Sequence, residues 1–355
     1  MKKTVIHPAF CLNGEKFASK KDFLEYVKTH LPEHFPFLQE WLNDQEIVTL
    51  QTSGSTGEPQ TLNFPKQALI ESAERTCRFF ELTEKTKALL ALSPSFVAGK
   101  MMWVRALHCG WSLDVIKPSS HLVIKKAYDF SALVPMQVKS SPGILSRIKK
   151  LIIGGAPVDD ELGKKIEKST NEVFLTYGMT ETLTHVAVQA LTEKASKRTG
   201  KNDKKWFHTL PGIEVSLNEN GCLVIYSPTL PYSPVVTNDL AEIKDNTTFK
   251  WLGRKDFVIN SGGVKLIPEQ IEKKLEPYIS YRFIISSLPD EKLGEKVVLV
   301  VEKEIPAHPE KIFDKAGLSK YETPKEIIII DTFPLTESGK IKRKDIREMI
   351  RMPLS

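Results

Sequence analysis

A stretch of hydroxyl side chains and glycines directly follows a short β-type run at residues 47–50. Its two glycines let the backbone turn tightly and direct N–H groups towards an anion, and its hydroxyl groups are further donors for phosphate oxygens. No Gly-Lys-Ser/Thr sequence follows, which excludes a Walker A loop. Its position between two strand-like runs favours a phosphate-binding loop over a flexible Ser/Gly linker. The loop consists of Thr52, Ser53, Gly54, Ser55, Thr56, Gly57, Glu58 and Pro59.

This loop and five further motifs, in the same order along the chain, resemble those of the adenylate-forming superfamily of acyl-CoA synthetases, luciferases and peptide-synthetase adenylation domains. Together the motifs span residues 52–341, so a chance match is negligible. The chain is therefore identified as a member of this superfamily, and the resemblance implies ATP, Mg²⁺ and coenzyme A as cofactors. The further motifs are Gly154-Gly155-Ala156-Pro157, Tyr177-Gly178-Met179-Thr180-Glu181, Thr237-Asn238-Asp239-Leu240, Gly253-Arg254-Lys255-Asp256 and Pro334-Leu335-Thr336-Glu337-Ser338-Gly339-Lys340-Ile341.

The resemblance implies that most of these motifs bind ATP. Residues 52–57 would hold the phosphates, and residues 154–157 would lie beside the adenine. Asp239 and Arg254 would hold the ribose, because a carboxylate accepts hydrogen bonds from hydroxyl groups and a guanidinium supplies a fixed cation. The expected nucleotide-binding residues are Thr52, Ser53, Gly54, Ser55, Thr56, Gly57, Gly154, Gly155, Ala156, Pro157, Tyr177, Gly178, Asp239 and Arg254.

The remaining motif residues are expected to act in catalysis. Glu181, preceded by Thr180, follows a turn after a buried strand, where a carboxylate could hold Mg²⁺ together with ATP phosphates. Lys340 lies in a Ser-Gly-Lys loop, from which its ammonium could neutralise charge on the α-phosphate and carboxylate oxygens. Asp256 is the expected hinge between two domains. Taken alone, Glu181 would more often be a solvated turn residue and Lys340 an ordinary lysine.

The chain departs from the usual motifs in four respects. Gln60 stands where the family usually has Lys, which weakens one phosphate contact or shifts it elsewhere. Asn238 replaces a usual Gly, which is tolerable because Asn also adopts a left-handed backbone. Lys265 stands where many members have Arg. The phosphate loop begins at residue 52, whereas most relatives have a longer region before it, so we expect a trimmed first domain.

Two short stretches indicate which acid is activated. Val134-Pro135-Met136-Gln137 and Ser261-Gly262-Gly263 resemble stretches of the o-succinylbenzoate–CoA ligases of menaquinone biosynthesis. Residues 93–99 stand where those enzymes have a pocket loop, although the usual His is absent. We therefore expect a carboxylic acid substrate, with o-succinylbenzoate as the first candidate.

An acid with one aromatic ring and two carboxylates needs both apolar walls and a cation. Phe96, Met102 and Val134 are candidates for the walls, and Gly99 belongs to the pocket loop. The candidates for pairing the second carboxylate are Lys100, Arg105 and His185, each of which, taken singly, would more often be a surface or packing residue.

Three other functions stay open at this point. The chain could activate a different aryl or fatty acid for coenzyme A, or it could load a carrier protein. It could also be a non-catalytic nucleotide-binding relative, although the presence of both Glu181 and Lys340 argues against this.

The pattern of elements predicts an α/β protein with two domains. Short apolar runs alternate with helical stretches up to about residue 213, and hairpin patterns follow, which predicts a trimmed α/β domain with a β-rich subdomain over residues 1–253. Residues 257–355 read as a small, mobile α+β domain that carries Lys340, with a hinge at residues 254–256.

The composition is that of a soluble globular protein. Of 355 residues, 41% are hydrophobic, and the net charge of +6 suits polyanionic ligands but gives no reason to invoke nucleic acid. Four scattered cysteines indicate neither a zinc site nor a disulfide framework. No signal peptide or membrane span is recognisable, so we expect a cytoplasmic protein that makes no membrane contact. A homodimer is one expected form of it. The lysine-rich residues 193–205 are expected to form a solvated loop, with contact to a coenzyme A phosphate as the alternative.

Overall fold

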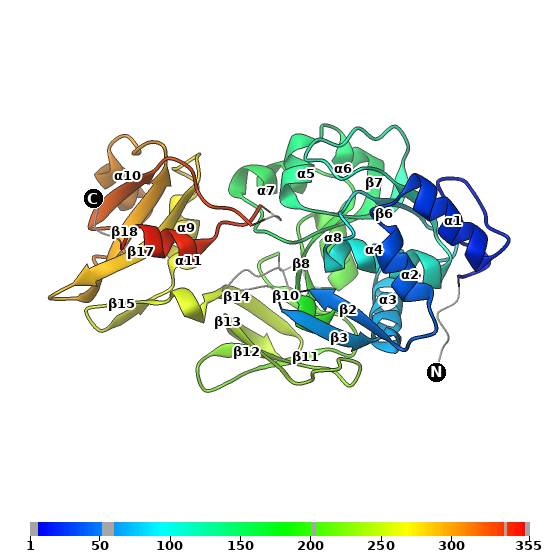
Figure 1. Cartoon of the computed structure of the whole chain (residues 1–355). Coiled ribbons are helices and arrows are strands. Elements are labelled where there is room, and N and C mark those ends of the chain that lie inside the picture. Colours follow the sequence, from blue (N-terminus) through cyan, green and yellow to red (C-terminus); the bar gives the residue numbers. More distant parts are fainter. Residues whose placement is uncertain (1–5, 52–59, 201–203, 337–338, 352–355) are drawn as a thin grey trace.

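The chain folds into a large domain and a smaller one that carries the C-terminus (Figure 1). This arrangement comes from a computed structural model, which describes residues 6–51, 60–200, 204–336 and 339–351. The predicted class, an α/β domain with a β-rich extension and a small α+β domain, is confirmed. No helix in the described ranges is long and apolar enough to cross a membrane.

One mixed sheet runs through the large domain. Within the described residues it has twelve strands in the order β1-β5-β4-β6-β7-β8-β9-β10-β14-β13-β12-β11. The strands from β1 to β8 in this order pair in parallel, and every pairing beyond β8 is antiparallel. The strands are β1 (Cys11–Leu12), β4 (Lys87–Leu90), β5 (Ser112–Val115), β6 (Tyr128–Leu133), β7 (Ile148–Ile153), β8 (Glu172–Gly178), β9 (His185–Ala190), β10 (Phe207–Thr209), β11 (Glu214–Leu217), β12 (Cys222–Tyr226), β13 (Val235–Asp245) and β14 (Thr248–Arg254).

Helices cover both faces of the parallel part, which explains why its strands are apolar throughout. In β7, Ile152 packs into one hydrophobic cluster, whereas Leu151 and Ile153 pack into a second cluster on the opposite face. The first face is covered by α3 (Lys66–Phe80) and α4 (Val97–Cys109), and the second by α5 (Pro135–Ser140), α6 (Ile144–Arg147) and α7 (Asp160–Glu167).

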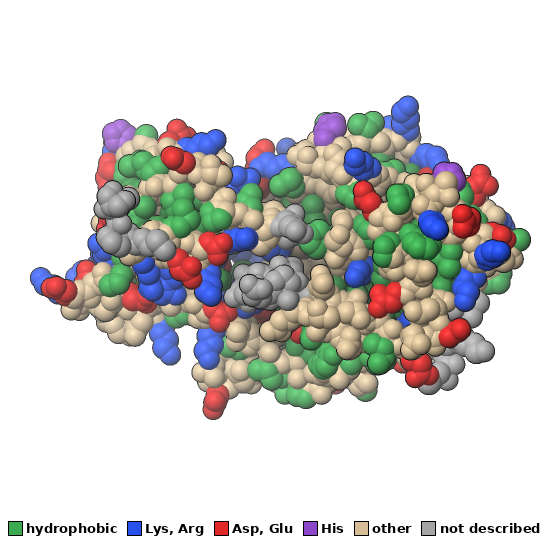
Figure 2. Space-filling view, viewed as in Figure 1, with side chains coloured by type: hydrophobic (Ala, Val, Ile, Leu, Met, Phe, Trp, Pro, Cys, Tyr) green, Lys and Arg blue, Asp and Glu red, His purple; other side chains and the backbone are tan. Residues whose placement is uncertain are grey.

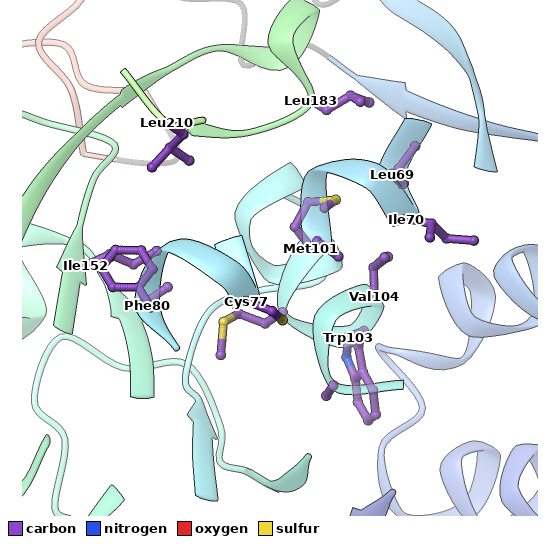
Figure 3. Close-up of a cluster of buried hydrophobic side chains, with 14 of the residues drawn as sticks. Leu69, Ile70, Cys77, Phe80, Met101, Trp103, Val104, Ile152, Leu183 and Leu210 are labelled. Carbon is purple, nitrogen blue, oxygen red and sulfur yellow. The ribbon is translucent and has the colours of Figure 1, made fainter. Parts of the chain in front are cut away.

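The expected helix over residues 66–82 is α3. Its buried residues Leu69, Ala73, Thr76 and Phe80 recur every three or four positions and so form one apolar face. This face packs against α4 in the largest cluster, shown in Figure 3, in which Met101 and Val104 of α4 lie beside Leu69. The same cluster contains buried residues of β4, β5, β6, β7 and β8, so it packs the two helices against one face of the parallel strands.

Near its start the chain also forms two helices and a small hairpin, whose buried side chains belong to the same cluster. These are α1 (Lys20–His30), α2 (Phe35–Leu42) and the antiparallel pair β2 (Ile47–Gln51) and β3 (Thr61–Pro65). The predicted strand-like runs on both sides of the phosphate loop are therefore confirmed. Residues 52–59 of the loop itself lie outside the described residues.

Hairpins extend the sheet after β9, as the sequence predicts. Gly221, with a φ of +74°, turns the chain between β11 and β12, and β13 and β14 form a second and longer hairpin. The expectation of a solvated loop at residues 193–205 is wrong in part, because Glu193–Thr199 form the helix α8. Arg198 of this helix pairs with Glu172 of β8, which draws the segment onto the sheet.

The small domain has its own sheet and its own apolar core. In the described ranges the sheet contains β15 (Ile259–Ser261), β16 (Val264–Leu266), β17 (Phe283–Asp290), β18 (Gly294–Glu302) and β19 (Glu326–Ile330), and the helices are α9 (Pro268–Leu275), α10 (Pro309–Lys315) and α11 (Arg343–Met349). The large sheet ends at Arg254 and the small one begins at Ile259, so the proposed hinge at residues 254–256 lies between the two sheets.

Candidate active site

The carboxyl ends of β7 and β8 carry two of the nucleotide motifs side by side. Gly154 follows β7, and a Cβ atom on it would stand 2.5 Å from the Thr176 Oγ1 of β8, so the close approach of the two strand ends requires glycine. Gly155 has a φ of +86° and lies beside Val134, one of the candidate pocket residues. The expected adenine side and the expected acyl pocket are therefore adjacent, while Ala156 and Pro157 continue the loop towards α7.

Asp239 lies at a junction of three other side chains. The Tyr177 hydroxyl donates a hydrogen bond to its Oδ2 at 2.6 Å, and the Trp251 Nε1 donates to its Oδ1 at 3.1 Å. Arg254 Nη1 stands 3.6 Å from the same Oδ1. Burial and the neighbouring Asp239 raise the pKa of Tyr177, which therefore stays a donor. The carboxylate of Asp239 is thus held in one orientation, with lone pairs left for further hydroxyl groups.

Lys340 of the small domain lies within electrostatic range of this junction. The Thr336 Oγ1 accepts the Lys340 N–H at 3.0 Å, and Gly339, directly before Lys340, has a φ of +81°. Burial lowers the pKa of Lys340, the charge of Arg254 lowers it further, and that of Asp239 opposes the shift. Lys340 therefore lies with two ribose-binding candidates in one electrostatic cluster that spans both domains.

Glu181 sits in the short turn Thr180–Thr182 between β8 and β9, half-buried. Within the described ranges no group of three or more His, Cys, Asp or Glu side chains is arranged to hold a metal. A single carboxylate fits Mg²⁺ when substrate phosphates complete the coordination shell, which is how this ion is commonly held at nucleotide sites. The position of Glu181 is compatible with that use.

The candidate pocket cations are not all in one place. Arg105 of α4 is buried, with 1% of its surface exposed, and its Nη2 donates to the Thr184 Oγ1 at 3.1 Å. The same hydroxyl lies 3.3 Å from the Nδ1 of buried His185. Burial lowers the pKa of Arg105 to about 10, and burial together with the charge of Arg105 lowers that of His185. Arg105 and His185 are therefore linked through Thr184.

These two side chains have unused hydrogen-bonding atoms. The Nε of Arg105 and the Nε2 of His185 are buried without a hydrogen-bond partner, and in the described part of the chain no carboxylate forms an ion pair with Arg105. A buried guanidinium without a counter-ion is unfavourable unless an anion reaches it. Arg105 therefore carries a buried positive charge that no described carboxylate pairs with.

Lys100 points elsewhere, because its Nζ lies 5.5 Å from the centre of the Phe37 ring on α2. Phe96 precedes α4 and is half-buried, and Gly99 in the first turn of α4 packs against the carbonyl of Ser93. The structure thus separates Lys100 from the linked pair, and Phe96 and Gly99 lie at the opposite end of α4 from Arg105.

Asp256 follows directly after the junction. Its carboxylate accepts from Arg254 Nη2 at 2.8 Å and from Asn238 Nδ2 at 3.3 Å. The sequence interpretation missed Trp251 and Thr184. The predicted hairpin carried a signal for Trp251. Pairing its two strands, β13 and β14, sets Arg254 opposite Asp239 and Trp251 opposite Ala241, which brings Trp251 close to Asp239.

The carboxyl end of the α/β sheet brings together residues that the sequence predicts to bind a nucleotide, and a lysine of the small domain lies within electrostatic range of two of them. The sequence matches the profile of the family described as AMP-binding enzyme over residues 4–223. This chain belongs to the AMP-binding enzyme family.

Individual relatives agree with this membership. A Dyadobacter fermentans protein described as acyl-CoA synthetase (AMP-forming)/AMP-acid ligase II-like has a solved structure with 35% identity, a TM-score of 0.58, and coverage of 90% of this chain and 93% of its own. A 2-succinylbenzoate–CoA ligase of Listeria monocytogenes is 22% identical, with 88% of this chain and 72% of the relative matched.

A third match extends the likeness of fold. The o-succinylbenzoate–CoA synthetase of Bacillus subtilis, solved with its acyl-adenylate intermediate, aligns with a TM-score of 0.70 at 19% identity, over 84% of this chain and 68% of that one. The superfamily predicted from the motifs is confirmed by these findings.

Proposed function

We propose that this protein is an ATP-dependent carboxylic acid–CoA ligase that works through an acyl-adenylate. The observation that carries the proposal is the ion pair of Asp239 and Arg254, the expected ribose-binding residues, with a lysine of the small domain, Lys340, within electrostatic range of both. CoA ligases among its relatives support the same reaction class.

In the first half-reaction, a carboxylate oxygen of the acid attacks the α-phosphorus of ATP and pyrophosphate leaves. Residues 52–57 would hold the phosphates, and Glu181 would hold Mg²⁺, whose charge would offset that of the phosphates. Asp239 and Arg254 fix the ribose. Lys340 stabilises the charge that develops between carboxylate and phosphate, as a preorganised cation at the reacting atoms.

In the second half-reaction, the thiol of coenzyme A attacks the acyl carbonyl and AMP leaves. Lys340 occupies space near the nucleotide, so we propose that the small domain turns about Asp256 to withdraw it and admit the thiol. On the small domain near its junction with the large one, Lys and Arg side chains lie among Asp and Glu side chains (Figure 2). The net charge of +6 over the whole chain suits the polyanionic coenzyme.

We propose o-succinylbenzoate as the acid. Several relatives are 2-succinylbenzoate–CoA ligases, and Arg105 and His185 offer a buried place for a second carboxylate. The aromatic ring would lie towards Val134 and Met102.

A panel of acids tests the substrate. A site that pairs a second carboxylate rejects acids without one, because its buried donors would stay unpaired, so we expect benzoate and medium-chain fatty acids to be poorer in kcat/KM by about 10²-fold. Arg105→Met should narrow this gap, and the matched control Lys100→Met should leave it unchanged. Thermal unfolding checks that Arg105→Met still folds.

Three results would redirect the proposal. Equal activity with monocarboxylic acids removes o-succinylbenzoate and leaves another acid–CoA ligase. If the acyl group passes from the acyl-adenylate to a carrier protein but not to coenzyme A, the protein is a loading enzyme. Absence of pyrophosphate release with every acid indicates a non-catalytic relative.

A further inference from the structure

The two domains also touch away from the nucleotide. Glu276, which follows the last residue of α9, accepts the backbone N–H of Asp160 at 3.2 Å. Asp160 is the first residue of α7, the helix that begins just after the adenine-side loop and faces the small domain in Figure 1. The contact therefore joins the C-terminal end of one helix to the N-terminal end of another across the domain boundary.

The two ends of α9 are fixed to the large domain in different ways. Near its start, the Glu269 carboxylate accepts the Arg254 N–H at 3.4 Å, directly beside the proposed hinge. Glu276 lies seven residues further on, which places it about 10 Å along the helix axis. A rotation at residues 254–256 would hardly move the first contact and would break the second, so the Glu276 contact reports closure of the domains.

The charges around this contact balance each other. The N-terminal end of α7 favours a carboxylate because its free N–H groups and the positive end of the helix dipole lie there. Burial and the carboxylates of Asp160 and Asp159 oppose this and raise the pKa of Glu276. Lys139 pairs with Asp159 at 2.9 Å and so relieves part of the repulsion. A single hydrogen bond of this kind contributes about 0.5–1.5 kcal/mol. That is enough to favour one arrangement of the two domains and little enough for the contact to break when they rotate.

We propose that Glu276 is a positioning residue whose hydrogen bond to the Asp160 N–H holds the small domain where Lys340 reaches Asp239, and whose release accompanies the turn to the thioester-forming arrangement. The inference rests on the proposed function, because it assigns Glu276 to the adenylating arrangement. Glu276 acts through Lys340 and touches no substrate.

Four variants of the full chain separate the contact from general effects. Glu276→Ala removes the acceptor, and Glu276→Gln keeps a carbonyl oxygen in its place. Asp160→Pro removes the donated N–H at the first helical position, where proline is well tolerated. Asp160→Ala removes the side chain and keeps the N–H. Domain arrangement is measured by small-angle X-ray scattering with ATP and Mg²⁺, and the half-reactions by pyrophosphate exchange and by thioester formation from supplied acyl-adenylate.

We expect Glu276→Ala and Asp160→Pro to give an expanded scattering profile and a kcat for exchange lowered about three- to tenfold, the effect of one lost hydrogen bond. Their KM for ATP and their thioester formation should be unchanged, and Glu276→Gln and Asp160→Ala should behave as wild type.

The proposal is overturned if both Glu276→Ala and Asp160→Pro stay as compact and as active as wild type, if Asp160→Ala opens like Asp160→Pro, or if the wild type is itself open with ATP present. Scattering does not depend on turnover, so a chain without exchange activity would refute the proposed function and still test this contact.

Discussion

Asp239 shows how much of the proposed site depends on single hydrogen bonds. Its carboxylate is nearly buried and accepts from Tyr177 and Trp251, which lie on different strands. A buried carboxylate held by two donors keeps its orientation without help from water. Arg254 then meets an acceptor that is already in place.

Lys340→Ala is expected to abolish the first half-reaction and leave the fold intact, because the side chain acts from a loop. The loss of pyrophosphate exchange should reach about 10²–10³-fold, as for removal of one preorganised charge. Thioester formation from supplied acyl-adenylate should survive. The exposed Lys344 supplies the control Lys344→Ala, and near-normal exchange in Lys340→Ala would refute the assigned role.

The pH dependence of the first half-reaction should reflect the lowered pKa of Lys340. The ammonium form is the active one, and it is lost as the pH rises through a pKa that lies below the ordinary lysine value of 10.5. The rate of exchange should therefore fall at a lower pH than an unperturbed lysine would give. A pH profile of exchange measures this, and an alkaline limb at the ordinary value contradicts it.

Trp251→Phe should loosen Asp239 by removing one donor. We expect the KM for ATP to rise about three- to tenfold with little change in kcat, and the preference for ATP over 2′-deoxy-ATP in exchange assays to narrow. Trp206, which packs against Lys244 and not against Asp239, provides the control Trp206→Phe. An unchanged preference in Trp251→Phe would show that the indole is mere packing.

At the scale of elements, local patterns carried the prediction a long way. The helix α3 and the hairpin around Gly221 follow from the spacing of Leu69, Ala73 and Phe80 and from turn residues, which act over a few positions. Helix α8 was missed because a short, lysine-rich segment with few apolar residues is typical of a solvated loop. In the folded protein Arg198 anchors this segment to the sheet. Such an anchor depends on Glu172, 26 residues earlier, and no local pattern contains it.

The candidate site was predictable to a similar extent. Six motifs predicted Asp239, Arg254 and Lys340, because order along the chain is enough to recognise them. The link from Arg105 to Thr184 joins residues 79 positions apart, and it arises only when α4 lies beside the segment that leads into β9. The choice among Lys100, Arg105 and His185 therefore needed the folded chain.

The start of α4 offers a test of how tightly this element is seated. A Cβ atom on Gly99 would stand 2.2 Å from the Ser93 carbonyl oxygen, so Gly99→Ala must displace backbone and should destabilise the protein by about 1–3 kcal/mol. The control is Gly163→Ala in α7, where nothing lies within 4 Å and alanine should stabilise by about 0.5–1 kcal/mol. Denaturant unfolding of both variants measures the difference, and equal stability would contradict the packing.

At the scale of the whole molecule, the hinge can be tested through its backbone. Asp256→Pro fixes φ and should restrict rotation of the small domain, so that exchange persists while transfer to coenzyme A fails. Asp256→Ala loses the contacts to Arg254 and Asn238 but keeps its freedom, and it should still transfer. Loss of both half-reactions in Asp256→Pro would leave the hinge at this residue without support.

The order of strands in the large sheet has a consequence for how the protein is made. The β11–β13 meander joins the rest of the sheet through β14, which pairs with both β10 and β13 and is the last strand of that sheet to be synthesised. Until residue 254 has left the ribosome, β10 and β13 each present an unpaired strand edge, and exposed strand edges are prone to aggregation. We expect nascent chains that stall before β14 to be the form that recruits chaperones.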